Sequence, residues 1–152
     1  MKSLGMAIVT STIWRLAGGK FEKWLEGPDL KFPNGLYVDG DELIVAAWGA
    51  PGTSAQSSAA SNLLSISLAD KKISNLGDGT PVGNLDGIEP IGHDFLVTDW
   101  VAGSLYRIDR KGKATQLLDL DQGSADIGYV PETGLLLIPM MMSEKLVAYK
   151  VQ

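Results

Sequence analysis

The sequence predicts an all-β fold of the β-propeller type, a half-propeller of about three to three and a half four-stranded antiparallel blades. Two observations carry this prediction. A pattern of strand, tight turn and strand occurs three times, at spacings of 52 and then 40 residues, which is close to the about 40–50 residues of one propeller blade. In addition, no segment shows a sustained helical period of apolar residues between caps.

Each repeat opens with a hairpin that starts at a polar residue and ends 14 positions later at a large apolar residue. Turn residues lie at the centre of each hairpin, and its second strand is a run of aliphatic and aromatic residues that is typical of a buried strand. These hairpins are Asn34–Trp48, Asp86–Trp100 and Asp126–Met140.

A second hairpin completes each repeat. The first spacing is longer because of a Gly, Ala and Ser-rich loop at residues 49–61, and the last repeat ends with a third strand, Leu146–Val151. The second hairpins are Ile13–Leu25, Leu63–Leu76 and Leu105–Leu118. The chain is therefore expected to be one domain, divided into a partial blade at 1–30, blades at 31–82 and 83–122, and a partial blade at 123–152.

Composition excludes several classes of function. With 13 basic and 18 acidic residues the formal charge is −5, and no cluster of lysines and arginines forms a nucleic-acid footprint. No apolar run approaches the roughly 20 residues of a membrane helix. The absence of cysteine excludes disulfides and thiolate chemistry. The single histidine, His93, lies in a predicted hairpin turn that points away from the axis, so we expect no histidine general base.

Residues 1–19 weakly resemble a signal peptide, but polar residues interrupt the apolar stretch and Arg15 follows it directly. A strand is the favoured interpretation. As it stands the chain is expected to be cytoplasmic, although a longer parent protein could be exported.

The predicted arc does not close on its own, since propellers close with about four to eight blades. Unpaired strands at its two ends would invite association. We expect two copies to pair head to tail as a homodimer with a ring of about six blades, in which Phe21–Leu25 is the fourth strand of the blade that ends at Val151. The alternative is that the chain is a piece of a longer protein.

The residues at the repeat starts resemble the gluconolactonase family, also called senescence-marker or regucalcin-like proteins, which are six-bladed propellers. The resemblance lies in the segments 32–36, 85–88, 97–100 and 105–109, and it covers about the C-terminal half of a family member. It implies a divalent cation, often calcium, at the mouth of the central channel. In the family a glutamate, asparagines and an aspartate hold that cation, and the aspartate is also the acid/base of lactone hydrolysis. Asn34 and Asp86 match two of these positions, whereas the glutamate belongs to blades that this sequence does not contain.

The residues themselves are compatible with such a site. Oxygen ligands suit a hard cation such as Ca²⁺, and the opening strands of blades line the axis, so Asn34, Asp86 and Asp126 are the candidate metal ligands. Asp86 is the candidate catalytic residue, which would transfer the proton of the attacking water. The alternative is purely structural, because Asn-Gly and Asp-Gly pairs are common turn devices that bond their own backbone.

Trp48 and Trp100 occupy equal repeat positions and are candidate substrate-binding residues at a sugar- or lactone-binding mouth; packing between blades is the alternative. Asp99 is predicted to cap the turn after its strand. Glu89 lies three residues after Asp86, an odd offset that places it on the opposite side of a regular strand.

Two functions remain open from the sequence. One is a metal-dependent hydrolase of sugar lactones or related esters, supported by the pair Asn34 and Asp86. The other is a non-enzymatic propeller scaffold that binds a small ligand or a protein partner and functions mainly through assembly of the homodimeric ring. The sequence does not decide whether the protein is an enzyme.

Overall fold

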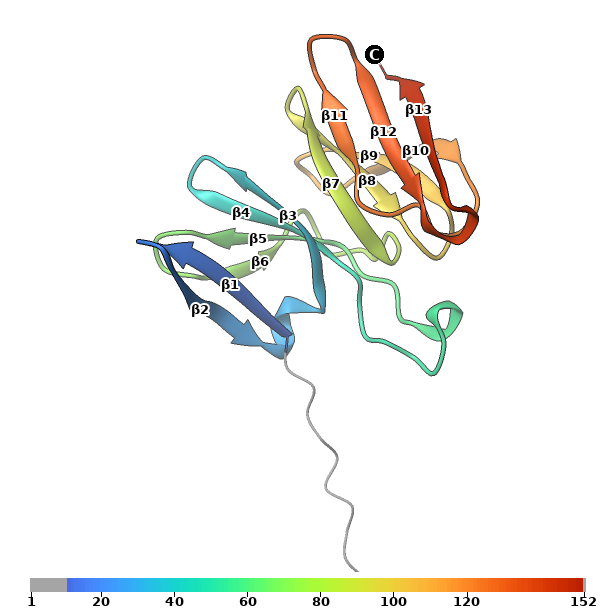
Figure 1. Ribbon diagram of the computed structural model, residues 1–152. Coiled ribbons are helices and arrows are strands. Elements are labelled where there is room, and N and C mark those ends of the chain that lie inside the picture. The colour runs from blue at the N-terminus through green and yellow to red at the C-terminus, as the bar shows by residue number, and fades with distance from the viewer. Residues whose placement is uncertain (1–10, 152) are drawn as a thin grey trace, which may run out of the picture.

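The computed structural model describes residues 11–151, and its strands form four antiparallel sheets that follow one another along the chain (Figure 1). The first ten residues, which include most of the signal-like stretch and the start of the expected partial blade at 1–30, lie outside the described residues. The prediction of an all-β fold is confirmed. No helix among residues 11–151 is long and apolar enough to cross a membrane.

The two middle sheets have four strands each, in chain order from one edge to the other. The first sheet has two strands and the last has three. The first sheet contains β1 (Ser11–Ala17) and β2 (Lys20–Gly27), and the second contains β3 (Pro33–Asp39), β4 (Glu42–Ala47), β5 (Leu63–Ser67) and β6 (Ile73–Asn75). The third sheet contains β7 (Leu85–Ile91), β8 (Asp94–Asp99), β9 (Ser104–Ile108) and β10 (Ala114–Asp119), and the last contains β11 (Gly128–Val130), β12 (Leu135–Met140) and β13 (Lys145–Lys150). Three short 3-10 helices complete the described chain: η1 (Pro28–Leu30), η2 (Ala55–Ser57) and η3 (Met141–Ser143).

The core lies in three layers, one between each pair of consecutive sheets. Strand β4 shows why its sequence is a continuous apolar run. Leu43 and Val45 pack toward the first sheet, whereas Ile44 and Ala46 pack toward the third. Side chains alternate between the two faces of a strand, so a strand covered on both sides must be apolar at every position.

The inner strands of successive sheets pack side by side, β3 beside β7 and β7 beside β11. A β-bulge interrupts β3 at Asn34-Gly35 and β7 at Asp86-Gly87, where two residues face one residue of the neighbouring strand. A Cβ atom at Gly35 would lie 2.3 Å from the carbonyl oxygen of Asp86. The glycine of each pair is therefore required by the close approach of the next sheet.

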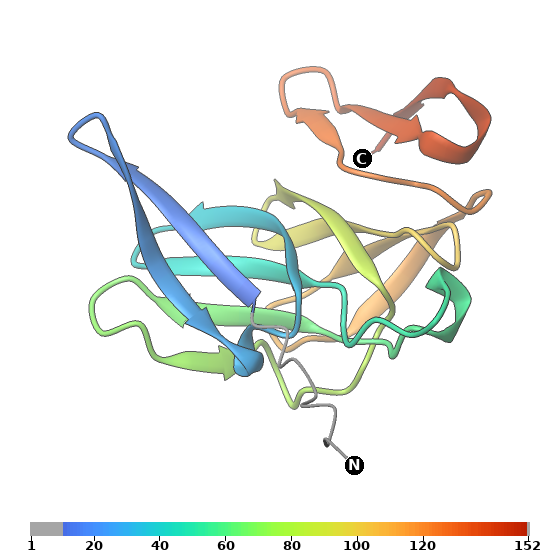
Figure 2. The ribbon, with the colours of Figure 1, turned by 60° about the horizontal axis from the view of Figure 1, so that its bottom comes forward.

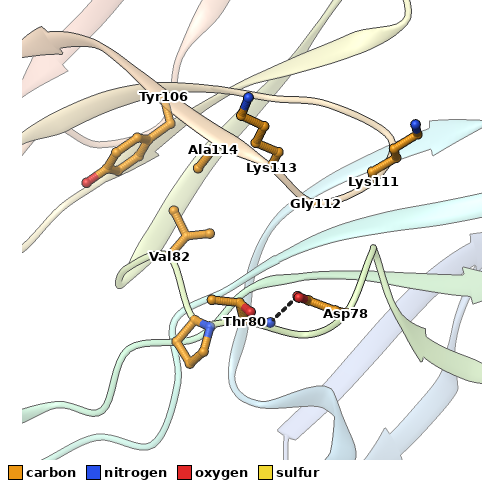
Figure 3. Close-up of a pocket in the computed structure, with 9 residues that line it drawn as sticks. Asp78, Thr80, Val82, Tyr106, Lys111, Gly112, Lys113 and Ala114 are labelled. Carbon is orange, nitrogen blue, oxygen red and sulfur yellow. Dashed lines mark hydrogen bonds between the residues drawn. The ribbon is translucent and has the colours of Figure 1, made fainter.

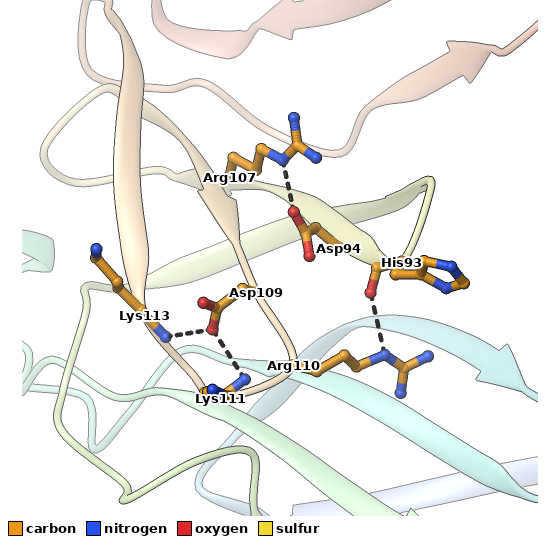
Figure 4. A network of polar contacts seen from close by, with 7 residues as sticks. All are labelled: His93, Asp94, Arg107, Asp109, Arg110, Lys111 and Lys113. Carbon is orange, nitrogen blue, oxygen red and sulfur yellow. Dashed lines mark hydrogen bonds and ion pairs between the residues drawn. The ribbon is translucent and has the colours of Figure 1, made fainter.

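Arg110 links the turns of the second and third sheets at the end of the sheets that is opposite to the two bulges. Its guanidinium forms ion pairs with Asp39 and Glu42, lies 4.9 Å from the centre of the Phe95 ring, and donates from Nε to the backbone oxygen of His93 at 3.2 Å (Figure 4). The His93 side chain is exposed in the β7–β8 turn, as predicted. This arginine therefore stabilises the contact between two neighbouring sheets.

Replacing Arg110 with methionine should lower the free energy of unfolding by about 1 kcal/mol, because the side chain is partly exposed and its ion pairs are screened by water. Urea denaturation at low and high salt measures the loss, which should shrink as salt rises. Lys113→Met is the control, since it removes the same charge from an exposed position on the third sheet. Equal losses in both variants would contradict a role for Arg110 between the sheets.

Candidate functional site

Asn34 and Asp86 meet at the starts of the inner strands β3 and β7. The Asn34 side-chain amide donates from Nδ2 to Asp86 Oδ2 at 3.0 Å. Both residues occupy the first position of a bulge in neighbouring sheets. The bulges and the short distance between the two strands thus bring together residues that are 52 positions apart in sequence.

Asp86 is an unusual carboxyl group because its side chain is nearly covered, with only 9 % of its surface exposed. Burial and the negative charge of Asp126 raise the pKa of Asp86 to about 6, while the hydrogen bond from Asn34 acts in the opposite direction. A carboxylate with a pKa near neutrality can both accept and return a proton at physiological pH.

Asp126 lies in the connection just before β11 and is exposed. Its Oδ1 accepts a hydrogen bond from the backbone N–H of Ile127 at 3.0 Å. The residue after Asp126 is Ile127, where the other two repeats have glycine, and β11 starts only at Gly128. Asp126 therefore acts on Asp86 through its charge, and the structure shows a direct hydrogen bond only for the pair Asn34 and Asp86.

Glu89 interacts with the last sheet, whereas Asp86 forms its hydrogen bond with Asn34 of the second sheet. The bulge at Asp86-Gly87 inserts one residue and changes the alternation of the strand. Burial and the charge of Asp126 both raise the pKa of Glu89, and a hydrogen bond from the backbone of Tyr129 opposes them. Glu89 is thus a further carboxyl group on the inner strand β7, close to the charge of Asp126.

The donor set for a cation is incomplete within the described chain. Among residues 11–151 no three Asp, Glu, His or Cys side chains lie close enough together to hold a metal ion. The side-chain oxygens of Asn34 and Asp86 are the hard donors that Ca²⁺ prefers, and they come from neighbouring strands. Within residues 11–151 these oxygens do not make up a metal site on their own.

Trp48 and Trp100 lie side by side at the ends of β4 and β8, with ring centres 5.7 Å apart and an angle of 48° between the rings. Asn84 bonds to the backbone of both residues. Its side-chain Nδ2 donates to the backbone carbonyl of Trp48 at 2.8 Å, and its backbone carbonyl accepts from the backbone N–H of Trp100 at 3.1 Å. Pro33 pairs with Ala47, so the end of β4 and the start of β3 lie at the same end of the sheet. The half-buried tryptophans thus lie at the same end of the sheets as Asn34 and Asp86, while Met140, at the equal position, is buried.

Two further polar residues stabilise this end of the third sheet. Asp99 Oδ1 accepts from the backbone N–H groups of Val101 and Ala102, both at 3.0 Å, which confirms its predicted role as a turn cap. Thr98, which the sequence analysis did not single out, accepts at Oγ1 from the bulge N–H of Gly87 at 2.9 Å and donates to the carbonyl of Ala125 at 2.8 Å. A lone threonine in an apolar strand was the only sequence signal for this link.

A further cavity lies away from these residues. It has a volume of about 470 Å³ and lies between the β6–β7 connection and the β9–β10 hairpin (Figure 3). Asp78 caps its own turn there by accepting from the Thr80 N–H at 2.8 Å. Tyr106, Lys111 and Lys113 line the facing wall. None of the predicted site residues contributes to this cavity.

Comparison with known proteins places the fold. No protein-family model matches the sequence, and no curated protein matches it. A solved structure of a nidogen/laminin complex superposes with a TM-score of 0.63 and 14 % identity, over 92 % of this chain and 61 % of the other chain. An auxiliary nutrient binding protein from Bacteroides thetaiotaomicron VPI-5482 superposes with a TM-score of 0.55 and 19 % identity, over 77 % of this chain and 31 % of the other.

The chain has a β-propeller fold. Both similar structures are propeller-type proteins, and at these identities the similarity concerns the fold alone. The protein spans less than two thirds of the length of either chain. The four sheets are thus successive propeller blades, and the molecule is a half-propeller.

Proposed function

We propose that this half-propeller hydrolyses sugar lactones or related esters with a divalent cation, using Asp86 as the general base. The observation that carries the proposal is the buried Asp86 carboxyl group with a pKa near 6, held by Asn34 from the neighbouring blade. The resemblance of the blade starts to gluconolactonases supports the choice of substrate.

Each residue then has a distinct task. Asn34 orients the Asp86 carboxyl group through its amide hydrogen bond, and Asp86 accepts the proton of the attacking water. Trp48 and Trp100 provide aromatic surface at the same end of the blades, against which the carbon face of a sugar ring packs. A cation held by oxygens of Asn34, Asp86 and Asp126, and completed by groups outside one copy, would polarise the lactone carbonyl.

Incubation with gluconolactone tests this proposal. The protein should open the lactone when Ca²⁺, Zn²⁺ or Mn²⁺ is present and lose that activity after EDTA treatment, with recovery when the metal returns. Metal addition should also raise the melting temperature, since a ligand that binds the folded state stabilises it. No hydrolysis with any of the three metals would overturn the proposed activity.

A second candidate function rests on the two open flanks. The first and last blades lie at opposite ends of the row (Figure 2) and are incomplete, with two and three strands. An apolar groove of about 430 Å³ lies between the first and second blades, and on the first blade Leu16 and Phe21 have 61 % and 76 % of their surfaces exposed. At the other end, Leu146 on β13 has 65 % of its surface exposed. Such exposed apolar faces mark interaction sites.

We propose that these faces cover each other in a homodimer, which makes the protein a propeller scaffold with a composite ring. The last blade of one copy would pack on the exposed apolar residues of the first blade of the other copy. Phe21–Leu25 lie in β2, which pairs with β1 on one edge. The other edge of β2 would extend the blade of the second copy that ends at Val151.

Leu146→Glu should convert the dimer to a monomer, because it places a charge in the apolar contact. Sedimentation equilibrium measures the mass, which for the unaltered protein should be twice the chain mass of 16.2 kDa. Leu117→Glu is the matched control, because Leu117 is a partly exposed leucine on β10, away from both flanks. A monomeric unaltered protein would contradict the homodimer.

A further inference from the structure

The apolar groove of about 430 Å³ between the first and second blades exposes the inner strand of the second blade. Leu36 and Val38 of β3 line this groove, and 47 % and 59 % of their surfaces are exposed. Trp14 of β1 also lines it and is 58 % exposed. Large apolar side chains that are exposed together mark an interaction site, so the groove is suited to a further apolar element.

The repeat shows which element covers this position in the next blade. Leu36 of β3 and Ile88 of β7 occupy equal positions, 52 residues apart. Ile88 is only 6 % exposed, because β3 and β4 of the preceding blade pack beside β7. Ile44 and Ala46 of β4 belong to the same core layer as Ile88. In the first blade the described residues form only β1 and β2, so the groove lies where the second strand of a complete blade would pack.

Strand β1 corresponds to the third strand of a blade. The segment Ile13–Leu16 in β1 aligns with Leu105–Ile108 in β9 at an offset of 92 residues. In the third and last blades the third strand pairs with the second strand, which directly precedes it in the chain. Strand β1 pairs with β2 along one edge, and no other strand of residues 11–151 pairs with its second edge. Such an edge is a template for one more strand.

The segment that precedes β1 in the sequence has the pattern of this second strand. The offset of 92 residues relates β8 to residues 2–7, which lie outside the described residues. In β8, Leu96 packs in the core layer shared with the next blade, and Thr98 bonds to that blade. The equivalents of these two residues are Leu4 and Met6, and the residues between and after them are small. Alternation of large apolar and small residues is typical of a strand with one face on a core.

We propose that residues 2–7 of this chain occupy the groove as the second strand of the first blade. Their backbone pairs with the second edge of β1, and the side chains of Leu4 and Met6 pack on Leu36 and Val38. The groove then has the same occupant as the equal position between the second and third blades. This inference does not depend on the proposed hydrolysis.

Nuclear Overhauser contacts between methyl groups in the isotopically labelled full chain test the placement directly. The methyl groups of Leu4 and Met6 should show contacts with those of Leu36 and Val38. In a sample that mixes labelled and unlabelled chains, the same contacts between different chains should be absent. Contacts only between different chains would assign the groove to a second copy and overturn the proposal, as would a lack of any contact between residues 2–7 and β3.

A matched pair of variants tests the alternation of the strand. Leu4→Asp places a charge in the apolar groove, whereas Ser3→Asp places the same charge on the opposite side of the strand. Leu4→Asp should speed hydrogen exchange at least about tenfold for the β1 amides that do not bond to β2, because the pairing strand is released. Ser3→Asp should leave these rates within about twofold of those in the unaltered protein. Equal rates in the two variants would show that neither face of the segment lies in the groove, and the proposal would fail.

Discussion

Asp86→Asn should lower kcat/KM for lactone hydrolysis at least about 100-fold, because a general acid or base contributes typically 10²–10⁴-fold to a reaction rate. Asparagine has the shape of aspartate and keeps an oxygen that can accept the hydrogen bond from Asn34. The variant therefore removes the proton acceptor, together with a charge that would help to hold the cation, and leaves the contact between the two blades in place. Initial rates with gluconolactone in the presence of metal measure the loss.

The pH profile makes the assignment specific. A base must be ionised to accept a proton, so kcat/KM of the unaltered protein should rise with pH as Asp86 ionises. The pKa of Asp86 is about 6 without metal, and a bound divalent cation lowers it. The residual activity of Asp86→Asn should lack this rise. A profile in the variant that keeps the same rise would assign the titration to another group, and Asp86 would not be the base.

Stability at different pH values provides the folding control for this variant. The pKa of Asp86 is raised in the folded state from 3.8 to about 6, so the folded protein binds the proton more tightly than the unfolded chain does. The stability that comes from the neutral carboxyl group is complete below about pH 4 and is lost as pH rises through about 6. Asp86→Asn should thus be more stable than the unaltered protein at pH 8, by on the order of 1 kcal/mol, and equal to it near pH 4. A variant that is less stable at pH 8 would mean that lost activity reflects damage to the fold.

The repeats in the sequence were sufficient to predict the all-β fold. Each apolar run forms a strand, and the strands on either side of it are similar from one blade to the next. The run Leu43–Ala46, for example, becomes a strand that is buried on both faces. The same alignment placed Asn34 and Asp86 at equal positions, and these residues form a hydrogen bond in the structure.

The surroundings of the site could not be predicted from the same pattern. The bulge at Asp86-Gly87 is a local change in hydrogen-bond register that alternation of residue types does not show. The partner of Thr98 is the carbonyl of Ala125 in the next blade, which becomes visible only when the distance between the blades is known. The pKa of Asp86 is likewise a consequence of burial.

Gly35→Ala should lower the free energy of unfolding by about 1–3 kcal/mol, a typical cost of an added methyl group in a packed region. The new Cβ would lie 2.3 Å from the Asp86 carbonyl oxygen and 3.1 Å from the Ile88 nitrogen, which are backbone atoms that cannot move aside alone. The two inner strands must then separate, and the hydrogen bond between Asn34 and Asp86 lengthens with them. Urea denaturation measures the loss of stability.

Gly128→Ala is the control for this substitution, since no atom lies within 4 Å of the Cβ position at Gly128 and its φ angle is not in the left-handed region. Both variants reduce the conformational freedom of the unfolded chain equally. The difference between their free energies of unfolding therefore measures the effect of the close approach of the blades. Gly35→Ala should also lower the pH at which Asp86 titrates, because separated strands admit water to the carboxyl group. If Gly35→Ala is as stable as Gly128→Ala, the glycine does not set the distance between the blades, and the contact that holds Asp86 must have another origin.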